Sequence, residues 1–435
     1  NMTIYRKTNQ EKYRKDRFCA AYIQELRKYY EVPQKDLAKI LHVSNSSLSR
    51  MESGQLNMDV DLFDQAIEYF EKYDPDYKFN RKIAQLEEAE QWIDRCVQDF
   101  IHLSYFKKLD EIKIYLDEEN SKHSFAYFHY KIVESFYDLF QNTGTAEDIK
   151  KIIDTQYFVS EYYVSILYDL CGIIKDTADL DVIESQIQYL QKALRCARQI
   201  DHYGLIGLIE YHLMYRLDDL NKPMQALELV KNCKEHLQQA GAYRRILTVQ
   251  MNEGILYRKL RIYSKAIEIF TNLSVNKEQV IDHQILTSLY DNFSWCLFMQ
   301  EKDEQALEYA MRSRELGSSF PDIYIVLVFS SYRLKRFDQC RQFAQEFIDQ
   351  ERKEDRALTI KLFMQLMIKV LNQELDVFDL EAQITSLLPF YRAIELKIPF
   401  YSSLIDYYRQ QNDLEQVIVL QEKLIQYLKF NNAFH

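Results

Sequence analysis

The stretch QKDLAKILHVSNSSLSRMESGQ, residues 34–55, decides how the N-terminal part of this 435-residue chain folds. Its first half follows Pro33, which suits the start of a helix, and carries Leu37 and Leu41 at helical spacing. Its second half, residues 43–55, is polar and rich in serine, although 14% of the chain is aromatic. The stretch therefore predicts two short helices, the second with an outer face that needs water or a polar partner.

The polar half separates into two faces when it is wound as a helix. Leu48 and Met51 fall together and predict a buried side, and Gly54 stands where the helix would end in a left-handed conformation. The opposite face holds Asn45, Ser46, Ser49 and Arg50. Short polar side chains and one arginine suit a groove of base edges and phosphates, because they reach a partner without being buried.

Composition sets the fold class and the charge balance. The chain is 47% hydrophobic, with only 8 glycines and 6 prolines, which predicts an all-α protein with short connections. The net charge of −11 is uneven: residues 1–58 hold 11 Lys+Arg and 6 Asp+Glu, a balance of +5, so the remainder carries −16. Because residues 1–58 are basic and the rest of the chain is acidic, we expect only this N-terminal part to bind a polyanion such as DNA.

The segment KYDPDYKFN, residues 72–80, is the predicted hinge between head and body. Pro75 disfavours helix at the residue before it, and the aspartates beside it favour a turn. We therefore divide the chain into a head, residues 1–72, a linker, residues 73–85, and a body, residues 86–435.

The second half of the body contains repeats. Small residues recur at intervals of 40, 40 and 34 residues: Ala226, Ala266, Ala306 and Cys340. Thirty-four is the period of the tetratricopeptide repeat, and Gly254, Tyr257 and Phe270 also fit its spacing around Ala266. Such helix pairs stack into a right-handed superhelix with a concave groove. Residues 86–200 are also helical, and we interpret them as degenerate repeats.

Two asparagines occupy the same repeat position. Asn252 and Asn292 each stand fourteen residues before a small residue, on the first helix of their repeats, where tetratricopeptide arrays face the groove. An asparagine donates and accepts together, so a ladder of them can hold an extended peptide backbone. Further polar or aromatic candidates for lining the same groove, which we call the wall residues, are Tyr211, Gln250, Tyr257, Tyr290 and Tyr324. Hydrogen bonds between helices, or ordinary polar surface, remain the alternative.

The head resembles the helix-turn-helix domain of the phage-repressor (Cro/cI, or XRE) class over residues 17–73. The resemblance implies a pair between Arg27 on the first helix and Glu52 at the end of the third. It also implies that Gln34, Ser44 and Gln55 contact phosphates, and that Asn45, Ser46, Ser49 and Arg50 face bases. Ser53 departs from the family, in which asparagine is usual. A helical subdomain that binds no DNA is the alternative.

A repressor-like head on a tetratricopeptide body resembles the peptide-pheromone receptors of low-GC Gram-positive bacteria, the Rgg, PlcR, PrgX and NprR group. The resemblance implies a homodimeric transcription regulator that binds a double-stranded DNA operator and holds a short linear signalling peptide in its groove. The related Rap proteins lack the DNA head. The competing hypothesis is therefore a Rap-like scaffold that binds a response regulator, with the head secondary.

Enzymatic chemistry finds little support in the sequence. It contains no GxGxxG, GxxxxGK[ST], HExxH or GxSxG motif, so we expect no catalytic site and no cofactor. His123 and His129 are six residues apart, on different faces of a helix, and make a poor metal pair. The seven dispersed cysteines predict reduced, mostly buried thiols. With no apolar run long enough for a membrane span and no visible signal peptide, we expect a cytoplasmic protein without membrane contact.

Overall fold

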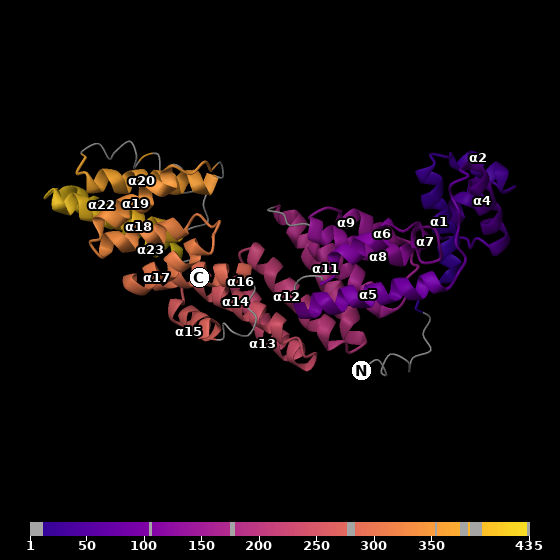
Figure 1. The fold of residues 1–435 in the computed structure, drawn as a ribbon, viewed down its shortest axis with the longest axis horizontal. Coiled ribbons are helices and arrows are strands. Elements are labelled where there is room, and N and C mark those ends of the chain that lie inside the picture. Colours follow the sequence, from indigo (N-terminus) through magenta and orange to yellow (C-terminus); the bar gives the residue numbers. More distant parts are fainter. Residues whose placement is uncertain are drawn as a thin grey trace. The chain divides into compact units, whose positions relative to one another are not determined.

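The computed structural model describes residues 12–103, 107–174, 179–275, 283–352, 355–374, 382 and 394–432. These residues hold 22 helices and no strand, so the all-α prediction is confirmed for them (Figure 1). Residues 1–11, part of the predicted head, lie outside the described residues. The contacts divide the chain into two compact units, Asn1–Leu256 and Tyr257–His435.

The described helices of the first unit range in length from 4 to 20 residues. The head contains α1 (Lys15–Tyr29), α2 (Gln34–Ile40), α3 (Asn45–Glu52) and α4 (Val60–Tyr73). The body continues with α5 (Ala84–Leu103), α6 (Leu109–Asp117), α7 (Glu119–Lys122), α8 (Tyr127–Gln141), α9 (Ala146–Asp154), α10 (Glu161–Ile173), α11 (Leu180–Gln199), α12 (Tyr203–Asp219), α13 (Pro223–Gln239) and α14 (Tyr243–Lys259). The division between the units falls within α14.

The second unit is built from the remaining helices, most of them joined by tight turns. They are α15 (Tyr263–Val275), α16 (His283–Met299), α17 (Asp303–Glu315), α18 (Ile323–Arg333), α19 (Phe337–Ile348), α20 (Asp355–Leu371), α22 (Ile394–Gln410) and α23 (Leu414–Asn432). Consecutive helices pack as hairpins, as α16 does with α17 and α18 with α19; α10 with α11 and α12 with α13 do the same in the first unit.

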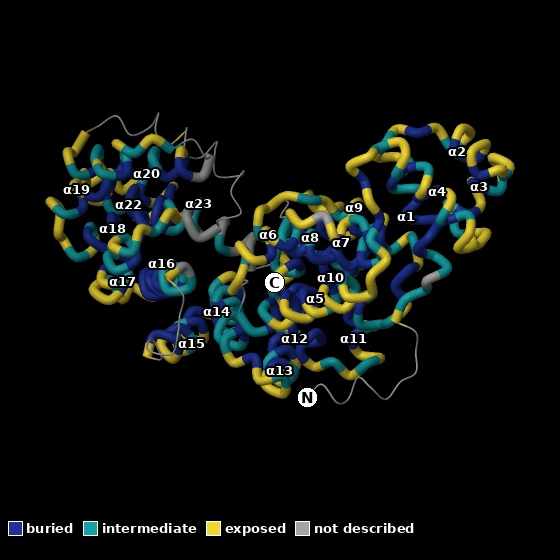
Figure 2. Tube along the Cα trace, turned by 45° about the vertical axis from the view of Figure 1, so that its right-hand side comes forward, coloured by how far each residue is buried: buried dark blue, intermediate teal, exposed yellow. Residues whose placement is uncertain are grey.

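The head shares an aromatic core with the first helices of the body. On α1, Phe18 and Tyr22 are buried and stacked, with ring centroids 5.3 Å apart. Phe18 also lies 5.6 Å from Phe128 of α8, and Tyr22 lies 5.0 Å from Tyr127. Figure 2 shows the buried residues of α5, α8, α10 and α12 gathered at the centre of this unit. The head is thus held by side-chain packing as well as by chain connectivity.

The predicted linker takes part in that packing. Tyr77 and Phe79 are buried, and the Tyr77 and Tyr22 hydroxyls lie 3.1 Å apart. The Asn80 backbone N–H donates to the His123 carbonyl at 2.7 Å. The aspartates and Pro75 do form a turn, but the aromatic residues that follow are anchored, so the contacts do not divide the chain at residues 73–85. The functional division into head and body stays a prediction.

The small residues of the repeats lie where the predicted packing requires them. Ala226, Ala266, Ala306 and Cys340 fall on α13, α15, α17 and α19, and each is fully buried. A small side chain at this point lets the two helices of a pair cross closely. All seven cysteines are free thiols, and six of them are buried.

The turn that precedes each of these small residues has one conformation in every repeat. The φ angles of Asn221, Arg261, Glu301 and Lys335 are 57°, 60°, 56° and 60°. In each turn the next residue donates its N–H to a carbonyl five residues back, as Lys222 does to Leu217 at 2.9 Å. This is the left-handed helix end that usually takes glycine, made here from other residues.

Candidate DNA-recognition surface and repeat-wall residues

The third helix of the head, α3, separates its polar and apolar residues between solvent and core. Leu48 is fully buried and Met51 is 7% exposed, as their spacing predicts. The side chains on the other face are exposed: Asn45, Ser46, Ser49 and Arg50. Ser44 caps the helix, because its Oγ accepts the Ser47 backbone N–H at 2.9 Å. The predicted base-facing residues therefore share one open face.

The Arg27–Glu52 pair forms between α1 and the end of α3. Arg27 donates Nε to Oε1 and Nη2 to Oε2 of Glu52, at 2.8 and 2.9 Å. The Glu52 side chain is only 2% exposed and that of Arg27 14%. Gln34 also donates its Nε2 to Glu52 Oε2 at 2.8 Å. The amide of Gln34 is thus occupied in the free protein, while its predicted phosphate contact stays a prediction.

The chain leaves α3 through a turn that contains Gly54. The φ angle of Gly54 is 71°, and Gln55 donates its N–H to the Arg50 carbonyl at 2.7 Å. The Gly54 carbonyl accepts a hydrogen bond from Nη1 of Arg17 on α1. Gln55, one of the predicted phosphate contacts, is exposed beside this turn. The contact of Arg17 is not predictable from the sequence, because an arginine early in a helix gives no sign of a distant carbonyl partner.

On the body, the structure brings together two of the predicted wall residues. Asn252 on α14 donates its Nδ2 to the Tyr211 hydroxyl of α12 at 3.3 Å and to the Thr248 carbonyl at 3.2 Å. Arg245 is 2% exposed, and its guanidinium lies 5.1 Å from the Tyr211 ring centroid. Arg245 precedes Asn252 by two helical turns and shares its face, a spacing by which the sequence could have identified it.

Gln250 lies on a different part of α14 from Asn252. At 3.6 residues per turn, two residues correspond to about 200° around the helix. Both side chains are half-buried. Gln250 and Asn252 therefore cannot face the same side of the groove, and we do not assign Gln250 to the peptide site.

In the second unit, Asn292 on α16 repeats part of the Asn252 arrangement. It donates its Nδ2 to the Ser288 carbonyl at 2.8 Å, four residues back, as Asn252 does to Thr248. These two backbone bonds are within single helices, whereas the bond from Asn252 to Tyr211 joins α14 to α12. Among the described residues, nothing donates to either asparagine side-chain oxygen. Tyr257 is half-buried.

Tyr290 and Tyr324 lie in the core of the second unit, each 5% exposed. Tyr290 lies 5.5 Å from the Tyr309 ring centroid, and the Tyr324 hydroxyl donates to Glu346 Oε1 at 2.6 Å. Because both rings are packed between helices, neither offers a face to a ligand in this structure. We therefore do not assign Tyr290 and Tyr324 to the peptide site.

Two further findings bear on the classes of protein considered. Within the described ranges, no three His, Cys, Asp or Glu side chains are grouped so that they could hold a metal ion. In the same part of the chain, no helix combines the length and the apolar character that crossing a bilayer requires.

Over the described residues, fold and surface together define an all-helical protein in which the four helices of the head precede tetratricopeptide-like hairpins. No protein-family model matches the sequence. The quorum sensor NprR from B. thuringiensis has a similar structure in its apo form, with a TM-score of 0.59 and 16% identity over 79% of this chain and 99% of that one. NprR in complex with its cognate peptide NprX aligns with a TM-score of 0.51 and 17% identity over 76% of this chain and 98% of that one.

Rap proteins are also among the similar proteins. The apo form of RapI aligns with a TM-score of 0.56 and 13% identity over 80% of this chain and 99% of that one. Regulatory protein RapD of Bacillus subtilis (strain 168) is 22% identical over 238 residues, which span 53% of this chain and 63% of RapD. The match thus covers less than two thirds of that relative. NprR and RapI share the helical-repeat fold with this chain. NprR belongs to the group that the sequence resembles, and RapI is one of the related Rap proteins.

Proposed function

We propose that this chain is a transcription regulator that binds DNA through α3 and responds to a short peptide held along the repeat helices. The observation that carries the DNA part is the open polar face of α3, with Arg50 and Asn45 exposed. The Arg27–Glu52 pair supports it, because it fixes α3 against α1 before any partner arrives. Arginine and asparagine are the side chains that read guanine and adenine edges best.

The test of this proposal is the selection of bound sequences from a random DNA pool. Fluorescence anisotropy then measures the affinity of the protein for the enriched site. Arg50→Ala should weaken binding about tenfold or more, since a base contact is worth about 1–3 kcal/mol. The matched control is Lys72→Gln, an 81% exposed lysine on α4 that is not among the predicted DNA contacts. Affinity should fall steeply with added salt. Equal affinities for the two variants would remove α3 as the recognition helix.

The peptide part of the proposal rests on Asn252 and Asn292. Each keeps an acceptor oxygen at the same repeat position, and the NprR–NprX complex supports a peptide ligand for this fold. The test is capture from a random heptapeptide pool by the immobilised full chain, with bound peptides read by mass spectrometry. Asn252→Ala with Asn292→Ala should lower capture, whereas Asn372→Ala, an asparagine after α20, should not. Unchanged capture by the double variant would reject these two residues.

A second candidate function is a scaffold that binds a response regulator, with the head secondary. The likenesses to RapI and RapD favour it. Size-exclusion chromatography of the chain with response regulators from the same genome would test it, at low and high salt. A salt-resistant complex together with no DNA selection would favour the scaffold over the regulator, because phosphate contacts are salt-sensitive. We propose homodimerisation for either function, measured by light scattering.

A further inference from the structure

A cleft separates α1 of the head from α8 and α9 of the body, all within the first unit. Its volume is about 810 Å³, and the turn after α3, which includes Gly54 and Gln55, lines one side. Pockets for small ligands occupy about 300–1,000 Å³. Its size therefore suits a small molecule or a short peptide. Of the predicted DNA contacts only Gln55 lines the cleft, and neither Asn252 nor Asn292 does.

Each of the three helices supplies a pair of opposite charges to the lining, and each adds one further carboxylate, namely Asp16, Asp138 and Asp154. The pairs are Glu25–Lys28 on α1 at 3.5 Å, Lys131–Glu134 on α8 at 2.5 Å and Asp148–Lys151 on α9 at 2.9 Å. All of them join side chains one turn apart on the same helix and are partly exposed. Such exposed pairs contribute little to stability, so a ligand can replace one partner at small cost.

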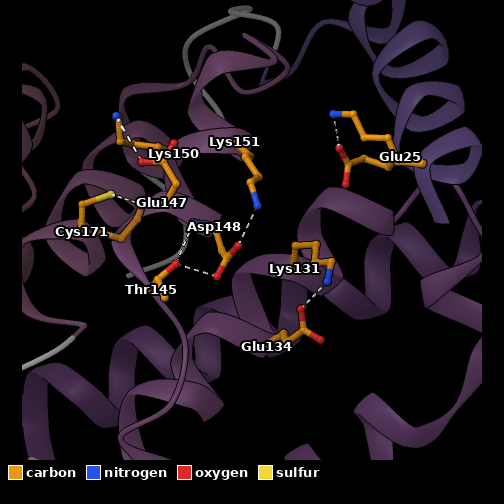
Figure 3. Close-up of polar contacts among 11 residues, drawn as sticks. Glu25, Lys131, Glu134, Thr145, Glu147, Asp148, Lys150, Lys151 and Cys171 are labelled. Atoms are coloured by element: carbon orange, nitrogen blue, oxygen red, sulfur yellow. Dashed lines mark hydrogen bonds and ion pairs between the residues drawn. The ribbon is translucent and has the colours of Figure 1, made fainter. Parts of the chain in front are cut away.

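The charges of opposite walls face the same space. Figure 3 shows Lys151 and Asp148 of α9, Lys131 and Glu134 of α8, and Glu25 of α1 around the cleft. The hydrogen bond and charge of Asp148 raise the pKa of Lys151, and the Glu25 carboxylate on the opposite wall adds to that effect. A ligand in the cleft would therefore meet ammonium and carboxylate groups together.

The base of the cleft is apolar and contains one unsatisfied donor. Buried residues there include Ala20, Ala21, Met51, Phe128, Ile149 and Ile152. The alanines leave room beside α1, where larger side chains would fill the space. Arg17 also lines the cleft, and its buried Nε–H has no hydrogen-bond acceptor among the described residues. That atom is covered by the protein, so it is the positive charge of the guanidinium as a whole that favours a carboxylate in the cleft.

We propose that this cleft binds a ligand with an ammonium and a carboxylate group on an apolar body, that is, a free amino acid or a short peptide. A ligand with charge of one sign would lie against like charges on every wall. A dipolar ligand can pair its carboxylate with Lys131, Lys151 or Arg17 and its ammonium with an acidic side chain. The site does not depend on the proposed function, because the charges assigned to the ligand lie on α1, α8 and α9. Glu52 of α3 also lines the cleft, but Arg27 already pairs with it.

The test is isothermal titration calorimetry of the full chain, without DNA, using L-leucine, the dipeptide Leu-Leu and the uncharged N-acetyl-leucine amide. Leucine or Leu-Leu should bind with a Kd of about 1 mM or tighter, and the amide should bind at least about tenfold more weakly. Lys151→Gln should weaken binding about tenfold. The matched control is Lys150→Gln, the next residue on α9, whose 3.4 Å pair with Glu147 lies outside the lining.

Each outcome decides the proposal or the source of the ligand. Binding of leucine alone, or of the dipeptide alone, would support the site and identify the amino acid or the peptide as its ligand. No binding of either charged probe would overturn the proposal. Equal binding of the amide would overturn the dipolar argument, and so would equal losses in Lys150→Gln and Lys151→Gln. Circular dichroism of both variants checks that they are folded.

Discussion

Arg27 and Glu52 join the first and third helices of the head through two parallel hydrogen bonds of 2.8 and 2.9 Å. The remaining Arg27 nitrogen, Nη1, donates to the Val32 carbonyl at 3.1 Å, in the turn before α2. Glu52 accepts in addition from Gln34 at the start of α2. One ion pair thus connects three helices, and the geometry of the recognition face depends on it.

Removing the carboxylate should destabilise the protein more than removing a surface charge. Glu52→Gln leaves the Arg27 guanidinium partly buried without a counter-charge, and breaking a buried pair costs about 3–5 kcal/mol. We expect a loss of about 3 kcal/mol in the free energy of unfolding, measured by urea denaturation. Lys28→Gln, which breaks a 3.5 Å exposed pair with Glu25, should lose less than about 0.5 kcal/mol. A similar small loss for both variants would show that the pair contributes little.

Gly54 and Gly241 have nearly equal φ angles, 71° and 72°, but different surroundings. A Cβ on Gly54 would overlap the end of the Arg17 side chain, whereas one on Gly241 would meet nothing within 4 Å. Both alanine variants should lose about 1 kcal/mol of stability, because a left-handed residue with a side chain is strained. Gly54→Ala should lose roughly 1 kcal/mol more, because Arg17 must move from the Gly54 carbonyl. Equal losses in thermal unfolding would mean that the Arg17 contact contributes nothing.

The head was more predictable than its attachment to the body. Helical spacing placed Leu48 and Met51 inside and Arg50 outside, and these placements are confirmed. Spacing along one segment cannot report what a distant segment covers. The sequence therefore predicted that Tyr77 and Phe79 belong to a hinge, although α1 and the segment before α8 bury them.

The repeats show a similar limit. Ala226, Ala266, Ala306 and Cys340 were identifiable because their spacing is periodic, and all four are buried. The turns between the helices were not identifiable from the sequence, because residues without turn preference, such as Arg261, Glu301 and Lys335, take the left-handed conformation there. The adjacent helix ends impose that conformation through their hydrogen bonds. The cleft lies beyond sequence reasoning for another reason, since its charges come from three helices far apart in the chain.

Lys335 offers a direct test of the strain in the repeat turns. Its φ angle is 60° and its side chain is exposed between α18 and α19. Lys335→Gly should raise the free energy of unfolding by about 1 kcal/mol, because glycine adopts this conformation without a Cβ clash. Lys335→Ala should change it by less than about 0.5 kcal/mol, because the strain stays. Urea denaturation of both variants decides the matter, and a loss of stability in the glycine variant would contradict it.

The buried ring of His129 should make the first unit less stable as the pH falls. Its ring is fully buried, both ring nitrogens lack hydrogen-bond partners within the described residues, and four aromatic rings surround it: Tyr13, Tyr157, Phe158 and Tyr163. Burial lowers the pKa of His129 to about 3, while an unfolded histidine titrates near about 6.5. The unfolded chain therefore binds a proton first as the pH falls, and the folded state loses stability.

The loss should begin below about pH 6.5 and amount to about 1.4 kcal/mol per pH unit until about pH 3. His129→Phe keeps an aromatic ring in the same surroundings and removes the titrating group. The difference in free energy of unfolding between variant and parent should thus grow from pH 7 to pH 4.5 by about 2–3 kcal/mol. Urea denaturation across that range measures it, and taking the difference cancels the carboxylates that titrate in both proteins. A constant difference would show that the folded protein accepts a proton at His129, contrary to the burial seen here.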